Sequence, residues 1–210
     1  MMVVFLGPPG AGKGTQAKRI AQELDLNRIS TGDMLREAVE KATLLGKQVE
    51  GFLKKGALVP DEIMLQIVSE EMKANPSAKK GFLLDGFPRT LKQAEELEKF
   101  TPVDKVIYFK CDPEVAISRL SGRRLCPQCR KVYNLITDPP VENELCDNCG
   151  TKLEQREDDC ETTVRKRFTV FENEILPLRK FYENKSILRE IDVCCDTEEA
   201  FSRIKEALIG

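Results

Sequence analysis

Short apolar runs alternate with amphipathic segments along the chain. Residues 2–6 form such a run, ended by Gly and Pro, and similar runs occur at 82–85, 106–109 and about 191–193. Apolar runs without polar alternation are typical of parallel strands that are covered on both faces. Because these runs alternate with helical patterns, we expect a doubly wound α/β fold around a parallel sheet.

Helices are predicted where apolar residues recur three and four positions apart between start and stop signals. The expected helices span 14–24, 61–74, about 113–123, 161–185, and the segment from about 198 onward. A further helical region is expected to start at 30–33, where hydroxyls would cap free N–H groups, to break near Gly46 and to close at Gly56. Asp61 is expected to cap the next helix, and Pro177 to kink the long one.

The pattern changes over residues 125–159, where Cys, Pro, Asn and acidic residues dominate and helical periodicity is lost. We interpret this segment as an insertion. It carries two Cys-x-x-Cys pairs, Cys126 with Cys129 and Cys146 with Cys149, separated by sixteen residues. Four thiolates at this spacing suit one structural Zn²⁺ per chain. Two disulfides, or a site that has lost its metal, are the alternatives.

Composition narrows the possible functions. Of 210 residues, 41% are hydrophobic and 32% are charged, as in ordinary globular proteins. The formal net charge of −2 predicts no general attraction to nucleic acid or to an anionic membrane. The chain has no histidine, which excludes a His triad, a His metal site and an imidazole base. No apolar run is long enough for a signal core or a membrane span, so a cytoplasmic location is expected.

Residues 7–15, Gly-Pro-Pro-Gly-Ala-Gly-Lys-Gly-Thr, lie between a predicted strand and a predicted helix. Such a loop turns backbone N–H groups toward a phosphate, and the helix directs its positive end at it. Gly14 stands where the common motif has Ser or Thr, and Thr15 follows. The residues expected to hold the phosphates are Gly10, Ala11, Gly12, Lys13, Gly14 and Thr15.

Several motifs together resemble the adenylate kinase family. They are the loop at 7–15, Ile-Ser-Thr-Gly-Asp-Met-Leu-Arg at 29–36, Leu-Asp-Gly-Phe-Pro-Arg-Thr at 84–90, Gly-Arg-Arg at 122–124, Arg-Glu-Asp-Asp at 156–159 and Thr-Val-Arg-Lys-Arg at 163–167. The resemblance covers residues 2 to about 180. It implies reversible, Mg²⁺-dependent phosphoryl transfer, ATP + AMP = 2 ADP, by a monomer with ATP, AMP and ADP as partners.

The resemblance also implies the domain organisation. A P-loop NTPase-type core with a five-stranded parallel sheet would comprise 1–29, 60–121 and 160–210. Residues 30–59 would form an AMP-binding flap, and 122–159 a lid of the long, zinc-binding type that closes over the site.

By the same resemblance, Lys13, Arg123, Arg156 and Arg167 would act on the transferring phosphoryl group. Arg119 and Arg123, four apart on one predicted helix, would share a face and meet ATP together with Val132 and Tyr133 of the lid. Arg36 and Arg89 would hold the AMP phosphate. The rest of the AMP pocket would comprise Thr31, Ala57, Leu58, Val59, Gly86, Phe87, Pro88 and Gln93, with Arg156 and Arg167 at its edge. Asp85 and Asp33 would hold Mg²⁺ through water.

Three other functions compete with this one. A kinase for UMP, CMP or GMP would share the loop, the arginines and the fold. A nucleic-acid-binding zinc ribbon is disfavoured because residues 126–163 hold four basic and nine acidic residues. A GTPase-like switch would need a guanine-reading element, and none is evident. No residue near the Cys194–Cys195–Asp196 turn can be assigned to the ATP adenine.

Overall fold

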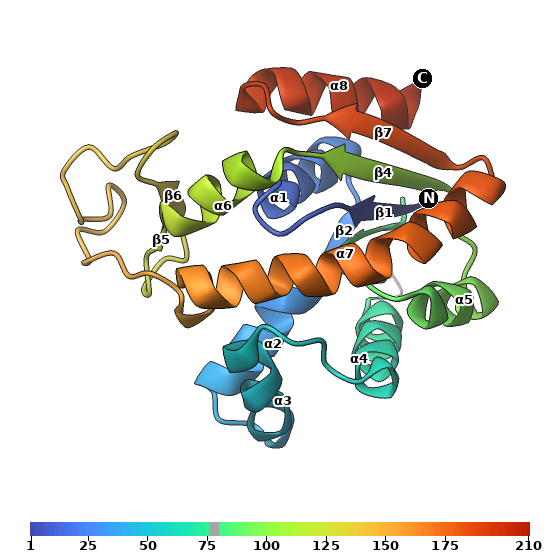
Figure 1. The fold of residues 1–210 in the computed structure, drawn as a ribbon, viewed down its shortest axis with the longest axis horizontal. Helices are drawn as coiled ribbons and strands as arrows, with labels where there is room; N and C mark the ends of the chain where they lie inside the picture. The colour runs from blue at the N-terminus through green and yellow to red at the C-terminus, as the bar shows by residue number, and fades with distance from the viewer. Residues whose placement is uncertain (76–79) are drawn as a thin grey trace.

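A parallel sheet of five strands forms the centre of the computed structural model, which describes residues 1–75 and 80–210 (Figure 1). The strands are β1 (Met2–Leu6), β2 (Asn27–Ser30), β3 (Phe82–Asp85), β4 (Lys105–Lys110) and β7 (Leu188–Asp192). Their order is β2-β3-β1-β4-β7, and every neighbouring pair is parallel. The predicted doubly wound α/β fold is confirmed. Within the described residues, no helix has both the length and the apolar character to cross a membrane.

Helices cover both faces of this sheet. They are α1 (Lys13–Leu24), α2 (Thr31–Glu40), α3 (Leu44–Lys55), α4 (Asp61–Ala74), α5 (Leu91–Phe100), α6 (Pro113–Ser121), α7 (Glu161–Asn184) and α8 (Thr197–Ile209). In Figure 1, α2 and α3 project below the sheet. The small antiparallel pair β5 (Arg123–Leu125) and β6 (Val132–Asn134) projects to the left, and the short turn η1 (Glu157–Asp159) leads from it into α7.

Alternate residues of the strands enter two separate apolar cores. Val4 and Leu84 pack with α4, α5 and α7, whereas Phe5 and Leu83 pack with α1 and α8. Successive strand residues point to opposite faces. A strand buried on both faces therefore needs an apolar residue at every position, which is the pattern that made these strands predictable.

Two elements that pack on the sheet or belong to it were missed by the sequence analysis, as were the short elements of the insertion. The strand β2 lies at the edge of the sheet, where only Ile29 is buried, so it lacks an apolar run. Helix α5 buries Gln93 together with Ala94 and Leu97, and this polar position breaks its apolar stripe. The strand near 191–193 was placed too late, since β7 ends at Asp192.

The break between α2 and α3 is not at Gly46, as predicted, but at residues 41–43. Ala42 adopts a positive φ of 49°, and the Thr43 hydroxyl accepts the N–H of Gly46 at 3.0 Å, which caps α3. Gly46 lies inside α3, where a Cβ would approach the carbonyl oxygen of Ala38 to 2.0 Å. Glycine is thus required there by close helix packing. The predicted closure at Gly56 is confirmed by its positive φ of 66°.

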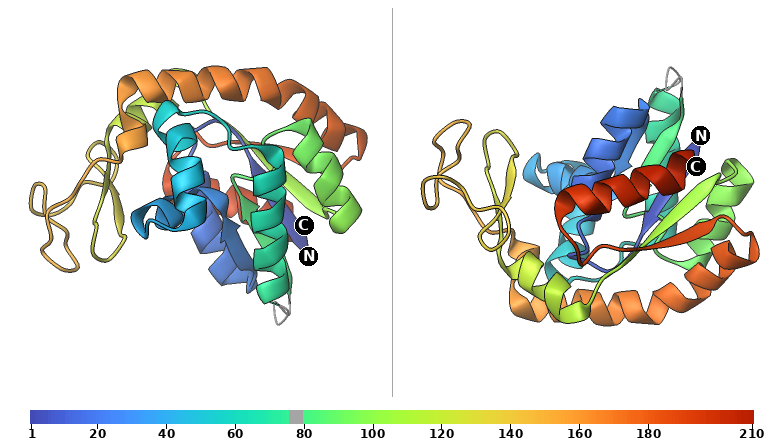
Figure 2. Two further views of the ribbon diagram at one scale, coloured as in Figure 1. Left: turned by 90° about the horizontal axis from the view of Figure 1, so that it is seen from below. Right: turned by 90° about the horizontal axis from the view of Figure 1, so that it is seen from above.

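Two other predictions about helix ends are corrected. Ser30 precedes α2, but its hydroxyl makes no cap and lies 3.4 Å from Asp85. Pro60, not Asp61, occupies the cap position of α4. The Asp61 carboxylate instead accepts a 2.7 Å hydrogen bond from Gln93. Pro177 lies inside α7, as predicted, and Figure 2 shows that this helix is bent along its length.

We predict opposite effects for alanine at the two glycines of α3. Gly46→Ala should lower the free energy of unfolding by about 1–3 kcal/mol, because its methyl group would overlap the α2 backbone. Gly51→Ala should raise it by about 0.5–1 kcal/mol, because the exposed Gly51 has open space around it and alanine favours helix. Urea unfolding of the two variants measures both changes. Equal effects would contradict the packing of α3 on α2.

Candidate active site

The loop between β1 and α1 has the backbone geometry of a phosphate cradle. Gly7, Gly10 and Gly12 all have positive φ, of 142°, 86° and 82°. A Cβ on Gly10 would lie 2.2 Å from the carbonyl oxygen of Ala116, so α6 can pack there only against glycine. Helix α1 begins at Lys13 without a side-chain cap, which leaves its first N–H groups available to an anion. The predicted strand–loop–helix arrangement is confirmed.

The side chain of Lys13 folds back over this loop. Its Nζ donates 2.7 Å hydrogen bonds to the carbonyl oxygens of Gly7 and Pro8. Burial lowers the pKa of Lys13 to about 7, although the charge of Asp85 opposes the shift. An anion beside Nζ would favour its charged form and raise this pKa again.

Asp85 and Asp33 reach the same loop from β3 and α2. A Cβ on Gly14 would lie 3.4 Å from an Asp85 carboxylate oxygen, so Asp85 lies beside the loop. The Arg28 guanidinium bridges the two carboxylates, with Nη2 2.6 Å from Asp85 Oδ2 and 3.1 Å from Asp33 Oδ2. Burial would raise the pKa of Asp33, but the charges of Arg36 and Arg28 hold it well below its usual range. The sequence analysis gave Arg28 no role, because it lies in the unpredicted strand β2.

Arginines from separate parts of the chain converge across the cleft from this loop. They are Arg36 in α2, Arg89 after β3, Arg123 in β5, Arg156 before η1 and Arg167 in α7. The fully buried Asp159 accepts two hydrogen bonds from Arg123, at 2.7 and 2.5 Å. Asp158 lies 2.9 Å from Arg167 and 3.8 Å from Arg36. These two aspartates belong to a motif noticed in the sequence, but their role as anchors was not predicted.

Positive charge is crowded in this part of the cleft. The pKa of Arg89 is lowered to about 10, first by burial and then by the like charges of Arg167 and Arg36. Burial lowers the pKa of Arg156 to about 10 as well, with Arg123 and Arg36 adding to the shift. Arg89 and Arg156 therefore stay charged at neutral pH. A polyanion would relieve their repulsion, so the site is organised in advance for phosphate groups.

A small pocket of about 50 Å³ lies beside Arg36 and Arg89. Its other lining residues include Leu35, Ala57, Leu58, Val59, Met64 and Gln93. The Gln93 amide donates to Asp61 at 2.7 Å, and its oxygen accepts the N–H of Arg89 at 2.7 Å, so its orientation is held by the protein. Thr31 donates to the carbonyl oxygen of Gly86 at 2.9 Å. Phe87 is fully buried and precedes Pro88 through a cis peptide bond.

Arg119 and Arg123 do not share a helix face, which corrects the sequence analysis. Helix α6 ends at Ser121, and Arg123 belongs to β5. Arg119 donates to the carbonyl oxygen of Val193 at 3.1 Å, which joins α6 to the turn after β7. Val193 and Cys195 both line the cleft. This turn is therefore where the C-terminal part of the chain, which the sequence left unassigned, reaches the site.

Val132 and Tyr133 both border the cleft, but the Tyr133 side chain points into the insertion. Only 2% of Tyr133 is exposed. Its hydroxyl lies 3.4 Å from Cys146 Sγ and accepts the N–H of Asp147 at 2.8 Å. The ring thus forms part of the core of the insertion, and Val132 is the more exposed of the two.

The four cysteines of the insertion form one compact cluster. Their sulfur atoms all lie within 4.8 Å of one another, with Cys126–Cys149 and Cys129–Cys146 at 3.4 Å. All four are free, so the disulfide alternative is not borne out. Four Zn–S bonds of about 2.3 Å in a tetrahedron place sulfur atoms about 3.8 Å apart. The cluster therefore fits Zn²⁺.

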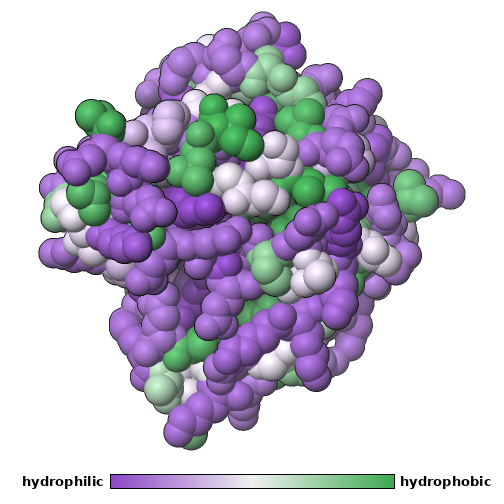
Figure 3. All heavy atoms as spheres, turned by 60° about the vertical axis from the view of Figure 1, so that its left-hand side comes forward, coloured by the Kyte–Doolittle hydropathy of each residue, from purple (hydrophilic) through white to green (hydrophobic). Residues whose placement is uncertain are grey.

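One cleft of about 1620 Å³ connects the phosphate loop, the carboxylates, the arginines and the insertion. It lies at the carboxyl ends of the strands, where open α/β sheets bind their ligands. The face turned forward in Figure 3 is mostly hydrophilic. Lys13 with its loop and the arginines, Arg36 and Arg89 among them, all line this one cleft. Fold and site together define a P-loop phosphotransferase that acts between two phosphate-bearing ligands.

Comparison with known proteins assigns the family. The sequence model described as adenylate kinase matches residues 5–187. The chain is 47% identical to an adenylate kinase of Archaeoglobus fulgidus, over 99% of this chain and 98% of the relative. It is 46% identical to one of Caldanaerobacter subterraneus subsp. tengcongensis, over 100% and 97%. The chain belongs to the adenylate kinase family.

We predict that ATP binding is coupled to protonation of Lys13. Its pKa of about 7 should rise when the phosphates bind, so the chain should take up nearly one proton at about pH 8.5. Affinity should be highest below pH 7 and should fall as the pH rises above 7. Calorimetry in buffers of different ionisation enthalpy measures the uptake. Lys13→Arg, which stays charged, should take up none; uptake by that variant as well would assign the proton to another group.

Proposed function

We propose that this chain catalyses reversible, Mg²⁺-dependent phosphoryl transfer from ATP to AMP, with two ADP as products. The observation that carries the proposal is that Lys13, its loop and five arginines line one cleft. Transfer between two nucleotides brings several phosphate charges together. A single nucleotide would not require Lys13 and five arginines in one cleft.

Positioning and charge stabilisation would perform the chemistry without a covalent intermediate. The N–H groups of residues 10–15 and Lys13 would hold the ATP phosphates, with Arg119 along the adenine. Arg36 and Arg89 would hold the AMP phosphate. The transferring group would lie between them, where its charge meets Arg123, Arg156 and Arg167. Forked guanidinium groups suit this role because each can contact two phosphate oxygens.

The carboxylates beside the loop suit a hydrated Mg²⁺. Asp85 and Asp33 offer oxygen ligands next to the position of the ATP phosphates, and magnesium commonly binds through one or two carboxylates while it keeps several waters. When bound, the ion would neutralise charge on the phosphate oxygens. Asp85 and Asp33 would orient its waters.

Water must be kept from the transferring group, and the two projecting segments would exclude it. Residues 30–59 would act as a flap over AMP and 122–159 as a lid over ATP. The core would comprise 1–29, 60–121 and 160–210, of which 76–79 lie outside the described residues. Ion pairs connect lid and flap: Arg130 contacts Glu40, and Arg156 Nη2 lies 4.0 Å from Asp33. Such contacts favour the closed arrangement.

A structural Zn²⁺ would stiffen the lid. Its four ligands would be Cys126, Cys129, Cys146 and Cys149, and the apolar core beside them adds only Tyr133 and Leu153 among the described residues. A segment with so small a core needs a metal or disulfides for stability.

We further propose a monomeric, cytoplasmic enzyme without nucleic-acid or membrane partners. Its eight free cysteines suit a reducing compartment, and its net charge of −2 gives no attraction to polyanions.

The acceptor nucleotide tests the proposed reaction. With Mg-ATP and AMP, GMP, CMP or UMP in separate assays, we expect rapid diphosphate formation with AMP alone. Arg36→Gln should raise the KM for AMP at least tenfold with a smaller change for ATP, because only the acceptor end loses a charge. Arg165→Gln, which removes an exposed charge paired with Glu161, is the matched control. If another monophosphate is preferred, the proposal that the acceptor pocket selects adenine would be wrong. If ATP is consumed at the same rate whether or not a monophosphate is present, the proposal that the chain transfers phosphate to a nucleotide would be wrong.

The metal is tested by analysis and removal. We expect one zinc per chain, and chelation should lower the melting temperature by roughly 5–10 °C while activity at low temperature falls less. Cys129→Ser should reproduce the loss of zinc. Cys160→Ser, at an exposed thiol outside the cluster, should leave zinc content unchanged. Protein without thiophilic metal, or equal loss of stability and activity, would contradict a purely structural zinc.

A further inference from the structure

Arg28 places a permanent positive charge between the phosphate loop and the two carboxylates. Its Nη2 lies 2.6 Å from Asp85 Oδ2 and 3.1 Å from Asp33 Oδ2. The same Nη2 would lie 3.6 Å from a Cβ on Gly14, the residue after Lys13. One guanidinium nitrogen thus occupies the space where loop and carboxylates meet.

The fold holds this group in place. Arg28 lies on β2, which pairs with β3 in a register that sets Ser30 opposite Asp85. Its side chain is 23% exposed, and that of Asp85 is 10% exposed. Its buried Nε has no hydrogen-bond partner among the described residues, so the guanidinium is held by the carboxylates rather than by a wider network.

Arg28 shares Asp33 with Arg36, whose Nη2 lies 2.6 Å from Asp33 Oδ1, so the two guanidinium groups together offset the charge of the two carboxylates. The carboxylates that Arg28 contacts, Asp85 and Asp33, are also the ones assigned by the proposed function to water on Mg²⁺. A cation at this position repels Mg²⁺ and competes with it for the oxygens. The same cation attracts phosphate when no metal is present.

We propose that Arg28 is a built-in counter-cation of the magnesium carboxylates and sets how strongly ATP binding depends on Mg²⁺. This inference rests on the proposed function, which assigns Asp85 and Asp33 to hydrated Mg²⁺. Arg28 is a positioning residue: it neutralises the carboxylates before the metal arrives, and the metal–nucleotide complex displaces it from them. It therefore weakens the coupling between metal and nucleotide.

The coupling is measured with AMP-PNP, in which an imide replaces the oxygen between the β and γ phosphates. Calorimetry gives its Kd with saturating Mg²⁺ and with EDTA, and the ratio of the two constants is the coupling. Arg28→Gln should increase this ratio roughly tenfold, because metal-free binding loses an attractive charge while metal-bound binding loses a competitor. Arg28→Lys, which keeps the charge, should stay within about threefold of the natural chain.

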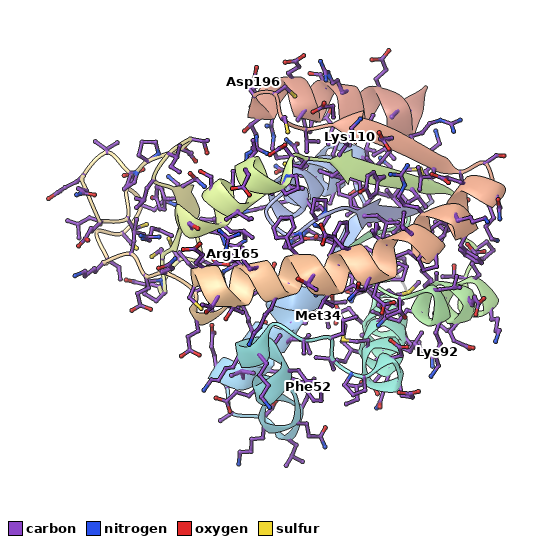
Figure 4. All side chains as sticks on the ribbon, in the orientation of Figure 1. Met34, Phe52, Lys92, Lys110, Arg165 and Asp196 are labelled. Atoms are coloured by element: carbon purple, nitrogen blue, oxygen red, sulfur yellow. The ribbon has the colours of Figure 1, made fainter. Side chains whose placement is uncertain are left out.

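Arg165→Gln is the charge-matched control. Arg165 lies near the start of α7 (Figure 4), is paired with Glu161 and does not line the cleft. The ratio of the two AMP-PNP dissociation constants should be the same in Arg165→Gln as in the natural chain. Binding of AMP to Arg28→Gln and the circular dichroism of that variant verify that it is folded.

An unchanged ratio in folded Arg28→Gln would overturn the inference and leave Arg28 as a brace between β2 and β3. In that case melting temperature would fall equally with and without Mg²⁺. The acceptor assay is independent, because rapid ADP formation from AMP supports the proposed reaction whatever Arg28 does. If the natural chain binds AMP-PNP with the same Kd with and without Mg²⁺, both the assignment of Asp85 and Asp33 to hydrated Mg²⁺ and the role of Arg28 would be wrong.

Discussion

Crowded positive charge in a partly buried cleft is the constraint on which the rest of this structure depends. Guanidinium groups repel one another, and burial strengthens the repulsion. Asp158 and Asp159 make the arrangement tolerable by holding Arg123, Arg167 and, less closely, Arg36. Because these residues come from α2, β5, η1 and α7, the ion pairs also join four elements from separate parts of the chain. The positive charge that these aspartates do not neutralise is available to bind phosphate groups.

The core and the insertion are stabilised by different means. The sheet is enclosed by two apolar clusters, and its strands hold the phosphate loop and Asp85 at fixed positions. The lid has an apolar core of four residues, two of which are cysteines. With the proposed metal bound, ligation would supply the rigidity of this insertion, which would then move as a unit. Separate stabilisation of the core and of the insertion would suit a site that opens to admit two substrates and excludes water when it closes.

Prediction from the sequence worked best where one physical requirement determined the residue type. Strands buried on both faces need continuous apolar runs, and β1, β3 and β4 were found; the edge strand β2 has no such need and was missed. Gly10 and Gly12 were recognised from a motif whose backbone demands glycine. Gly46 was misinterpreted as a break, because its reason is the approach of α2, a neighbour that no local pattern shows.

By itself, the sequence determined the fold class, the phosphate loop, the cluster of four cysteines and the family, since each depends on residue types at short, fixed spacings. The tertiary structure decided which charges meet. It placed Arg28 between Asp33 and Asp85, fixed Gln93 on Asp61, and separated Arg123 from the helix of Arg119. Such pairings join residues from different elements, and their energy depends on distance and burial, which only the folded chain defines.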